Sequence, residues 1–299
     1  MYEWRQEMMQ VVIQQLCKNY GSKQVLNGIN LTLSTGMFGL LGPNGAGKST
    51  LMQVLATVIP KTSGDVQIGH CKLGRDEREI RGLLGYLPQE FGVYRKLTGA
   101  EYLDYVASMK GITNGKARRE AVAEMLRRVN LEEKRHVRIG KYSGGMRQRI
   151  GIAQALLGDP QFIIVDEPTA GLDPEERMRF RDMLTELGKD RTVLLSTHVV
   201  ADIDNNCKSM AIMNGGRIVF HGTQEQLLQR VQGQVWTVQV GDEKLAELKE
   251  AATIVTARRS GAGYEARVLA SSAPLPGAVQ ETAGLEDGYI AVMRAGNRE

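Results

Sequence analysis

The sequence predicts an α/β fold with a mostly parallel sheet, and two observations carry this prediction. Short segments with a continuous apolar run, at 161–166 (QFIIVD) and 192–197 (TVLLST), are typical of strands that are covered on both faces. Segments with helical apolar spacing alternate with such strands, as at 101–110 and 116–129. This alternation favours a parallel sheet flanked by helices. The composition agrees, because 42% hydrophobic and 24% charged residues fit an ordinary globular protein.

The predicted elements follow in order along the first part of the chain. Strands are expected at 11–16 and 29–33, the second because its apolar residues alternate. The apolar run 37–42 ends in glycine and opens into a segment compatible with a helix, 48–59. The remaining predicted elements are a strand at 83–88, helices between 97 and 157, a helix led by Pro174, and a hairpin at 211–222 around Asn214-Gly215-Gly216.

A composition shift near Gln232-Gly233 predicts two domains, 1–233 and 234–299. The second reads as strand, helix, strand, strand, helix, strand, with the last helix at 275–284 and the last strand at 289–293. That order predicts a small C-terminal α+β domain of the ferredoxin-like kind. We expect a regulatory or dimer-stabilising role for it, and a passive appendage is the alternative.

Charge and hydropathy set the expected compartment. The net charge of +4 is too small to indicate a nucleic-acid binder. A basic surplus lies between Lys116 and Arg149, and it is either a solvated helical surface or a face near an anionic membrane or nucleic acid. No apolar run has the roughly 18 residues of a membrane span, and the three cysteines show neither disulfide nor zinc spacing. We therefore expect a cytoplasmic protein.

The strongest motif is GPNGAGKST at 42–50, which matches the phosphate-binding pattern GxxxxGK[ST] between a predicted strand and a helix. Its glycines let successive backbone N–H groups turn toward phosphate oxygens, and the next helix adds its positive end. Lys48 would reach the β- and γ-phosphates and Ser49 would hold Mg²⁺. The plain alternative is a glycine-rich turn. The expected nucleotide-binding residues here are Gly42, Asn44, Gly45, Ala46, Gly47, Lys48, Ser49 and Thr50.

A second signal is the apolar strand that ends in Asp166-Glu167. Asp166 would bind the metal, and Glu167 would activate the attacking water as general base. A strand that ends in two carboxylates means little alone. It gains weight in a chain that also carries the pattern at 42–50.

With these two motifs, the chain resembles the ATP-binding subunits of ABC transporters over about residues 10–230. The resemblance implies a P-loop NTPase core of the ABC type with an antiparallel β subdomain and a helical signature subdomain, and it implies ATP and Mg²⁺ as cofactors. Beyond the two motifs above, it rests on Tyr20, Gln89, Ser143-Gly144-Gly145-Met146, Leu172-Asp173 and His198.

The resemblance also implies roles. Tyr20 would stack on adenine, and Gln89 would touch Mg²⁺ and the attacking water. His198 would contact the γ-phosphate. The signature residues Ser143, Gly144 and Gly145 would act in trans on ATP held by a second copy, with Asp173 of the D-loop nearby.

Each of these residues also has a plain interpretation. Ser143 would only cap the helix at 146–157, and Gly144-Gly145 would be its tight entry. Tyr20 would end a strand, His198 would be a packed histidine, and Gln89 a loop amide. The segment from Phe91 to Leu97, with Tyr94, is either core or the groove for a permease's coupling helix.

The signature reads YSGGM where LSGGQ is commoner, and such variants resemble those of ABC-2 type systems, which are mostly exporters. The leading hypothesis is a homodimeric ATPase subunit, peripheral on the inner face of the membrane, that energises a separate permease for export. The alternative is a soluble ABC-type ATPase acting on nucleic acid or the ribosome. A P-loop kinase or GTPase is the third class, and the sequence lacks the NKxD motif that a GTPase needs.

Overall fold

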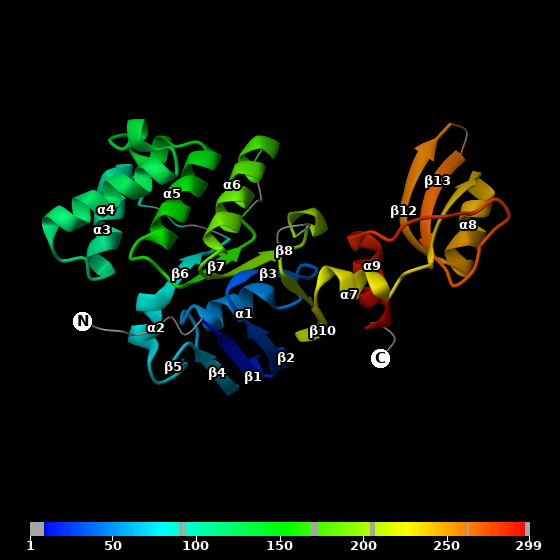
Figure 1. The fold of residues 1–299 in the computed structure, drawn as a ribbon, viewed down its shortest axis with the longest axis horizontal. Helices are drawn as coiled ribbons and strands as arrows, with labels where there is room; N and C mark the ends of the chain where they lie inside the picture. The colour runs from blue at the N-terminus through cyan, green and yellow to red at the C-terminus, as the bar shows by residue number, and fades with distance from the viewer. Residues whose placement is uncertain are drawn as a thin grey trace.

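The computed structural model describes residues 9–89, 92, 94–168, 173–203, 207–261 and 263–296. Its strands form three sheets, and helices pack around them (Figure 1). The central sheet has the strand order β10-β9-β3-β8-β7-β6. Its strands are β3 (Gly36–Leu41), β6 (Leu84–Leu87), β7 (Phe162–Asp166), β8 (Thr192–Thr197), β9 (Ser209–Asn214) and β10 (Arg217–Gly222).

The predicted parallel sheet is confirmed. Strands β9, β3, β8, β7 and β6 run parallel, and only β10 pairs antiparallel, as the arm of the predicted hairpin. Every residue of β3, β7 and β8 is buried. Alternate side chains of β8 pack into different apolar cores. Val193 and Leu195 belong to one cluster, and Leu194 belongs to the other. Both faces of the sheet are therefore covered, as the apolar runs predicted.

One face carries the helical part of the chain, and its long helices begin at capping side chains. The Thr98 hydroxyl and the Glu101 carboxylate form a capping box at the start of α3, and Asn114 caps α4. Pro174 lies in the first turn of α6, as expected. These helices are α3 (Gly99–Met109), α4 (Gly115–Arg128), α5 (Gly144–Leu156) and α6 (Pro174–Leu187), with the 3₁₀ turns η1 (Glu132–Lys134), η2 (Ile139–Lys141) and η3 (Val200–Asp202).

The other face packs against α1 (Lys48–Leu55) and an antiparallel sheet of order β2-β1-β4-β5. This sheet contains β1 (Val11–Tyr20), β2 (Lys23–Leu33), β4 (Ser63–Ile68) and β5 (Cys71–Lys72). The predicted strands at 11–16 and 29–33 are parts of β1 and β2. Strands β4 and β5 and the helices α2 (Glu77–Leu83) and α7 (Gln224–Gln229) have no counterpart among the predicted elements.

The C-terminal region confirms the first half of its prediction only. Strand β11 (Val235–Val240), helix α8 (Asp242–Ala251) and strands β12 (Thr253–Ser260) and β13 (Gly263–Leu269) occur as expected. The predicted helix at 275–284 is wrong, because that segment holds the two-residue strand β14 (Val279–Gln280). The predicted strand at 289–293 is also wrong and lies in helix α9 (Leu285–Ala295).

Helix α9 forms because its apolar side chains recur at helical spacing and have a surface to cover. Leu285, Tyr289, Val292 and Met293 pack with Leu227 of α7 in the same cluster as the helical face of the central sheet. The tertiary contact overrides the short apolar run that resembled a strand. Figure 1 shows α9 lying beside α7, apart from the sheet of β11–β13. The division at 233 and 234 stays a prediction, since α9 shares a core with the first region.

Candidate functional site

The loop between β3 and α1 has a backbone that only glycine accommodates at several points. Gly45 and Gly47 have φ values of +81° and +104°, in the region that favours glycine. A Cβ at Gly42 would collide with the carbonyl oxygen of Met213 in β9. Helix α1 begins directly after Gly47, so its unpaired N–H groups open toward the loop.

This loop lines a cavity of about 560 Å³, a size within the range of small-molecule sites. Seven of the eight predicted loop residues form one wall, and residues from distant segments form the others. The lining residues are Lys23, Gln24, Val25, Asn44, Gly45, Ala46, Gly47, Lys48, Ser49, Thr50, Gln89, Glu167, Gly215 and Gly216. Gly42 does not line the cavity, but its carbonyl oxygen accepts a hydrogen bond from the Lys48 ammonium.

Lys48 is held in a fixed position at the floor of the cavity. Its side chain is 4% exposed, and Nζ donates to the carbonyl oxygens of Gly42 (2.7 Å) and Pro43 (3.3 Å). Nζ also lies 3.3 Å from Oε1 of Glu167. A buried ammonium needs such partners, because its charge is costly to remove from water.

Glu167 is the point at which the predicted catalytic residues meet. Its Oε2 accepts from Nε2 of Gln89 at 3.3 Å and lies 3.1 Å from Nδ1 of His198. Its backbone has φ +45°, a strained conformation for a non-glycine residue, and its N–H donates to Oγ of Ser196 at 3.1 Å. Gln89 follows β6, Glu167 follows β7 and His198 follows β8, so the parallel order of the strands brings the three together.

Asp166 lies deeper, with 2% of its surface exposed. Burial raises the pKa of this carboxyl, while hydrogen bonds from Ser196 and Ser49 and the charge of Lys48 act in the opposite direction. The hydroxyl of Ser49 therefore lies beside the carboxylate of Asp166. Hydroxyl, carboxylate and amide oxygens are the ligands that Mg²⁺ prefers, so the donor set of Ser49, Asp166 and Gln89 fits that ion.

Tyr20 lies at the end of β1 and does not line the cavity. Its ring is 48% exposed and carries the ammonium of Lys18 at 4.9 Å from the ring centroid. The ring thus presents an open face to solvent, as either a strand-end tyrosine or a base-stacking platform requires.

The signature residues lie elsewhere in the same chain. Oγ of Ser143 accepts from the N–H of Met146 at 3.2 Å, which caps α5 as the plain interpretation expects. Gly144 has open space around its Cα, whereas a Cβ on Gly145 would collide with the carboxylate of Glu176. Asp173 caps α6 by accepting from the N–H of Glu176 at 2.8 Å. None of these residues lines the cavity beside Lys48.

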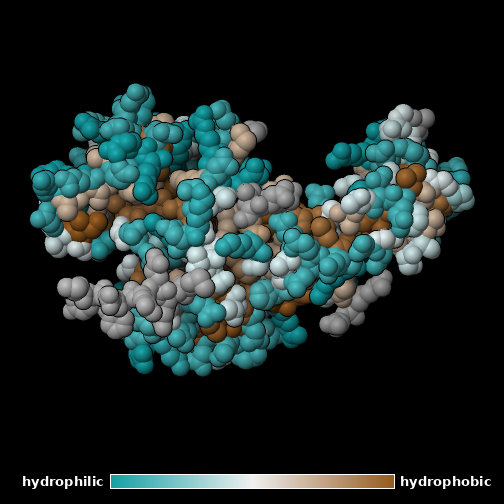
Figure 2. All heavy atoms as spheres, viewed as in Figure 1, coloured by the Kyte–Doolittle hydropathy of each residue, from teal (hydrophilic) through white to brown (hydrophobic). Residues whose placement is uncertain are grey.

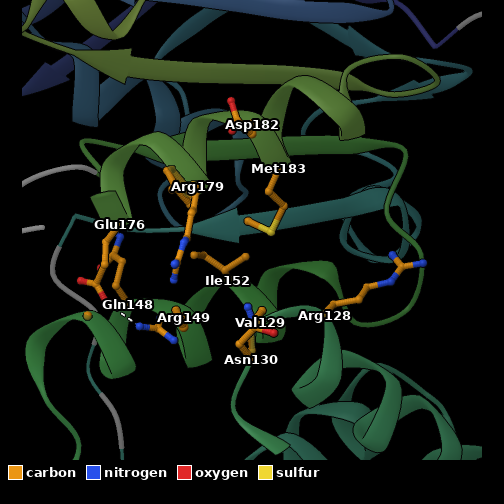
Figure 3. A pocket seen from close by; sticks show the side chains of 12 residues that line it. Arg128, Val129, Asn130, Gln148, Arg149, Ile152, Glu176, Arg179, Asp182 and Met183 are labelled. Carbon is orange, nitrogen blue, oxygen red and sulfur yellow. Dashed lines mark hydrogen bonds and ion pairs between the residues drawn. The ribbon is translucent and has the colours of Figure 1, made fainter. Parts of the chain in front are cut away.

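Helices α5 and α6 enclose a second, smaller cavity of about 280 Å³ (Figure 3). At one end, Nη2 of Arg149 pairs with Oε1 of Glu176 at 2.5 Å, which ties the signature helix to α6. Nε2 of Gln148 donates to the carbonyl oxygen of Pro168 at 2.9 Å, one residue beyond Glu167. The signature helix is therefore joined both to the segment that follows β7 and to α6.

The structure describes only some residues of the predicted permease groove. Phe91 lies outside the described residues, as does Leu172 of the D-loop. Tyr94 is 59% exposed, and its ring contacts those of Tyr102 and Tyr105 on α3 with centroids 6.4 and 5.8 Å apart. Leu97 packs partly against the core.

Part of the cavity wall was not predicted from the sequence. Gly215 and Gly216 in the β9–β10 turn line it, and the N–H of Gly216 donates to the carbonyl oxygen of Ala46 at 3.0 Å. The signal was present in the Asn-Gly-Gly turn, which was used only to predict a hairpin. Ser196, which contacts both Asp166 and Glu167, was also missed because a buried strand serine has no motif of its own.

Comparisons with known proteins agree with this geometry. Residues 26–170 match the family model described as ABC transporter. The uncharacterised ABC transporter ATP-binding protein YxlF of Bacillus subtilis is 38% identical over 95% of this chain and 99% of its own. The linearmycin resistance ATP-binding protein LnrL of that species is 36% identical over 72% and 70%. The solved dimer of MJ0796, a bacterial ABC transporter cassette, matches with TM-score 0.66 and 27% identity over 71% and 98%.

Proposed function

Because this chain belongs to the ABC transporter family as an ATP-binding subunit, we propose that it cleaves ATP to drive a separate membrane permease that exports its substrate. The convergence of Lys48, Gln89 and His198 on Glu167 is the observation that carries the ATPase part of the proposal. Export is supported by relatives named for linearmycin resistance, daunorubicin resistance and Nod factor export.

The chemistry follows from the four side chains. Backbone N–H groups of the loop at 44–50 bind the phosphates, and Lys48 turns from Glu167 toward the β- and γ-phosphate oxygens. The Glu167 carboxylate, released from the ammonium, accepts a proton from the attacking water. His198 and Gln89 orient that carboxylate and the water. Ser49, Asp166 and Gln89 hold Mg²⁺, which when bound neutralises phosphate charge.

The active form in this proposal is a pair of identical chains. Ser143, Gly144 and Gly145 lie at the positive end of α5, away from the cavity of their own chain. A second copy would present them to the γ-phosphate, and Asp173 would lie close to the interface. Tyr20 would stack on adenine through its open ring face. The solved cassette MJ0796 supports pairing, because it is dimeric, including in a post-hydrolysis state bound to ADP and Pi.

The permease would dock beside the segment that follows Gln89. The exposed Tyr94, stacked edge-on against Tyr105, offers an apolar surface there. Among the described residues, no helix has the length and apolar character to cross a bilayer, so the transport pathway is assigned to the permease. We propose that this permease holds the subunit at the inner face of the membrane.

The basic segment does not favour nucleic acid as a partner. Several of its arginines already face carboxylates, since Arg127 and Arg128 pair with Glu124, and Arg149 pairs with Glu176. These ion pairs reduce the positive charge that the segment offers to a phosphate backbone. We propose that the region 234–299 stabilises the dimer.

Substitution of the general base tests the proposal. Glu167→Gln keeps the size of the side chain and removes its basicity, so ATP cleavage should fall by about 10²- to 10⁴-fold while ATP still binds. A stable ATP-dependent dimer should then accumulate, measured by size-exclusion chromatography with radiolabelled ATP. Glu175→Gln, on the exposed start of α6, is the matched control and should cleave ATP at the normal rate. Undiminished cleavage by Glu167→Gln would refute the assignment.

A further inference from the structure

Three side chains with metal-binding chemistry meet beside the antiparallel sheet, and none of them lines the nucleotide cavity. His70 lies in the turn between β4 and β5, Cys71 begins β5, and Glu79 lies in the first turn of α2. One ligand atom from each lies within 4.8 Å of the others. Cysteine spacing gave no hint of the cluster, because a histidine and a glutamate supply the other two ligands.

The backbone holds these residues in place. The Asp76 carboxylate accepts from the N–H of Lys72 at 2.9 Å, and the Asp76 N–H donates to the carbonyl oxygen of Lys72 at 3.0 Å. These bonds fix the start of α2 against β5. Cys71 is also paired with Ile68 in the β4–β5 ladder and is fully buried. The cluster therefore sits on a braced corner of the fold, as a metal site requires.

The three groups crowd together with more negative than positive charge. Nε2 of His70 lies 2.6 Å from Oε1 of Glu79. The Cys71 thiol has a raised pKa, first through burial and then through the charges of Glu79 and Asp76. An exposed His–Glu pair by itself adds little to stability, and it gives no reason for a thiol to face the same carboxylate.

We propose that His70, Cys71 and Glu79 bind one zinc-type divalent cation through Nε2, Sγ and a carboxylate oxygen. A tetrahedral zinc ion holds its ligand atoms roughly 3.3–3.8 Å apart, so small side-chain rotations close the present cluster around it. Thiolate and imidazole favour zinc and similar transition metals over Ca²⁺ and Mg²⁺, which prefer oxygen. Water fills the fourth position, because His70 and Glu79 are largely exposed to solvent.

The bound ion would tie the β4–β5 turn to α2. Helix α2 leads directly into β6, and Gln89 follows β6. The cation would therefore stiffen the segment through which the antiparallel sheet connects to the nucleotide cavity. Because the three ligands are brought together only in the folded chain, the ion should bind the folded chain more tightly than the unfolded one. It should therefore raise the temperature of unfolding.

Cobalt titration of the metal-free full-length protein tests the site. Co²⁺ bound to a cysteine thiolate gives a near-ultraviolet charge-transfer band, and no cysteine lines the nucleotide cavity, so this band does not arise from metal bound there. We expect one equivalent of Co²⁺ to develop the band and zinc to displace it. His70→Ala and Glu79→Gln alter exposed side chains and should fold normally, and each should weaken binding at least tenfold.

Matched controls separate the cluster from other ligands of the chain. Cys71→Ser should abolish the band, whereas Cys207→Ser, at a buried thiol elsewhere, should leave it intact. His136→Ala and Glu77→Gln serve as the histidine and glutamate controls, the latter on the same helix. The proposal is overturned by the absence of a thiolate band, by binding that survives His70→Ala unchanged, or by equal loss in the Cys207→Ser control.

Discussion

Arg267 of β13 and Asp287 of α9 form a bidentate ion pair. This pair joins the C-terminal sheet to α9, the helix that packs against α7. Nε of Arg267 lies 2.9 Å from Oδ1 and Nη2 lies 2.7 Å from Oδ2 of Asp287, whose side chain is 1% exposed. Nη2 also donates to the carbonyl oxygen of Thr282, and Asp287 accepts from the N–H of Gly284 at the start of α9. One carboxylate thus fixes both the arginine and the first turn of the helix.

Loss of this carboxylate should destabilise the C-terminal region. Asp287→Asn leaves Arg267 without its counter-charge, and breaking a buried pair costs about 3–5 kcal/mol. Arg267 is 29% exposed, so solvent compensates part of the loss and we expect about 2 kcal/mol. Urea unfolding measures the change. Glu286→Gln, at the exposed neighbour on α9, should stay within about 0.5 kcal/mol of the unchanged protein, and an equal loss in both variants would contradict the role of the pair.

The β9–β10 turn should prove to be part of the nucleotide site. Gly216 has φ +77°, and a Cβ there would collide with the carbonyl oxygen of Val25, a residue that lines the cavity. Gly216→Ala should therefore weaken ATP binding at least tenfold, as measured by fluorescence with a labelled ATP analogue. Gly215→Ala is the control, because Gly215 also has positive φ (+52°) but open space around its Cα. Similar ATP affinities for the two variants would mean that the positive φ, and not the collision with Val25, causes the loss of binding.

Stability should rise with pH through the buried ammonium of Lys110. Burial lowers the pKa of Lys110 to about 8, and Nζ donates to the carbonyl oxygens of Leu157, Ala155 and Leu84. The unfolded chain keeps the ordinary pKa near 10.4, so between about pH 8 and 10 it binds more protons than the folded chain. Raising the pH through this window therefore favours folding.

Comparison with a variant isolates this effect from other titrating groups. Relative to Lys110→Met, the unchanged protein should gain stability between pH 7 and pH 9.5, measured by urea unfolding at both values. Lys116→Met, on the solvated side of α4, should show no such difference. A stability gap that stays constant with pH would mean that Lys110 remains charged in the fold.

Several features were predictable from the sequence because they depend on short-range chemistry. The apolar run before Asp166 and the glycines around Lys48 act within a few residues, and the structure has the buried strand and the loop before α1 where expected. Strands β4 and β5 escaped prediction because they are short, mixed in polarity and stabilised mainly by pairing with β1. Helix α9 was mistaken for a strand because its five-residue apolar run has no period of its own.

The sequence by itself determined the nucleotide chemistry of this protein, since a phosphate-binding loop and a pair of carboxylates are encoded in contiguous residues. Only the tertiary structure decided that Gln89 and His198 both contact Glu167, that Gly216 closes the cavity, and that Arg267 and Asp287 anchor the C-terminal region. These contacts join residues 20 to 170 positions apart. Their formation depends on the order of strands in a sheet and on the packing of helices across it, which no local pattern specifies.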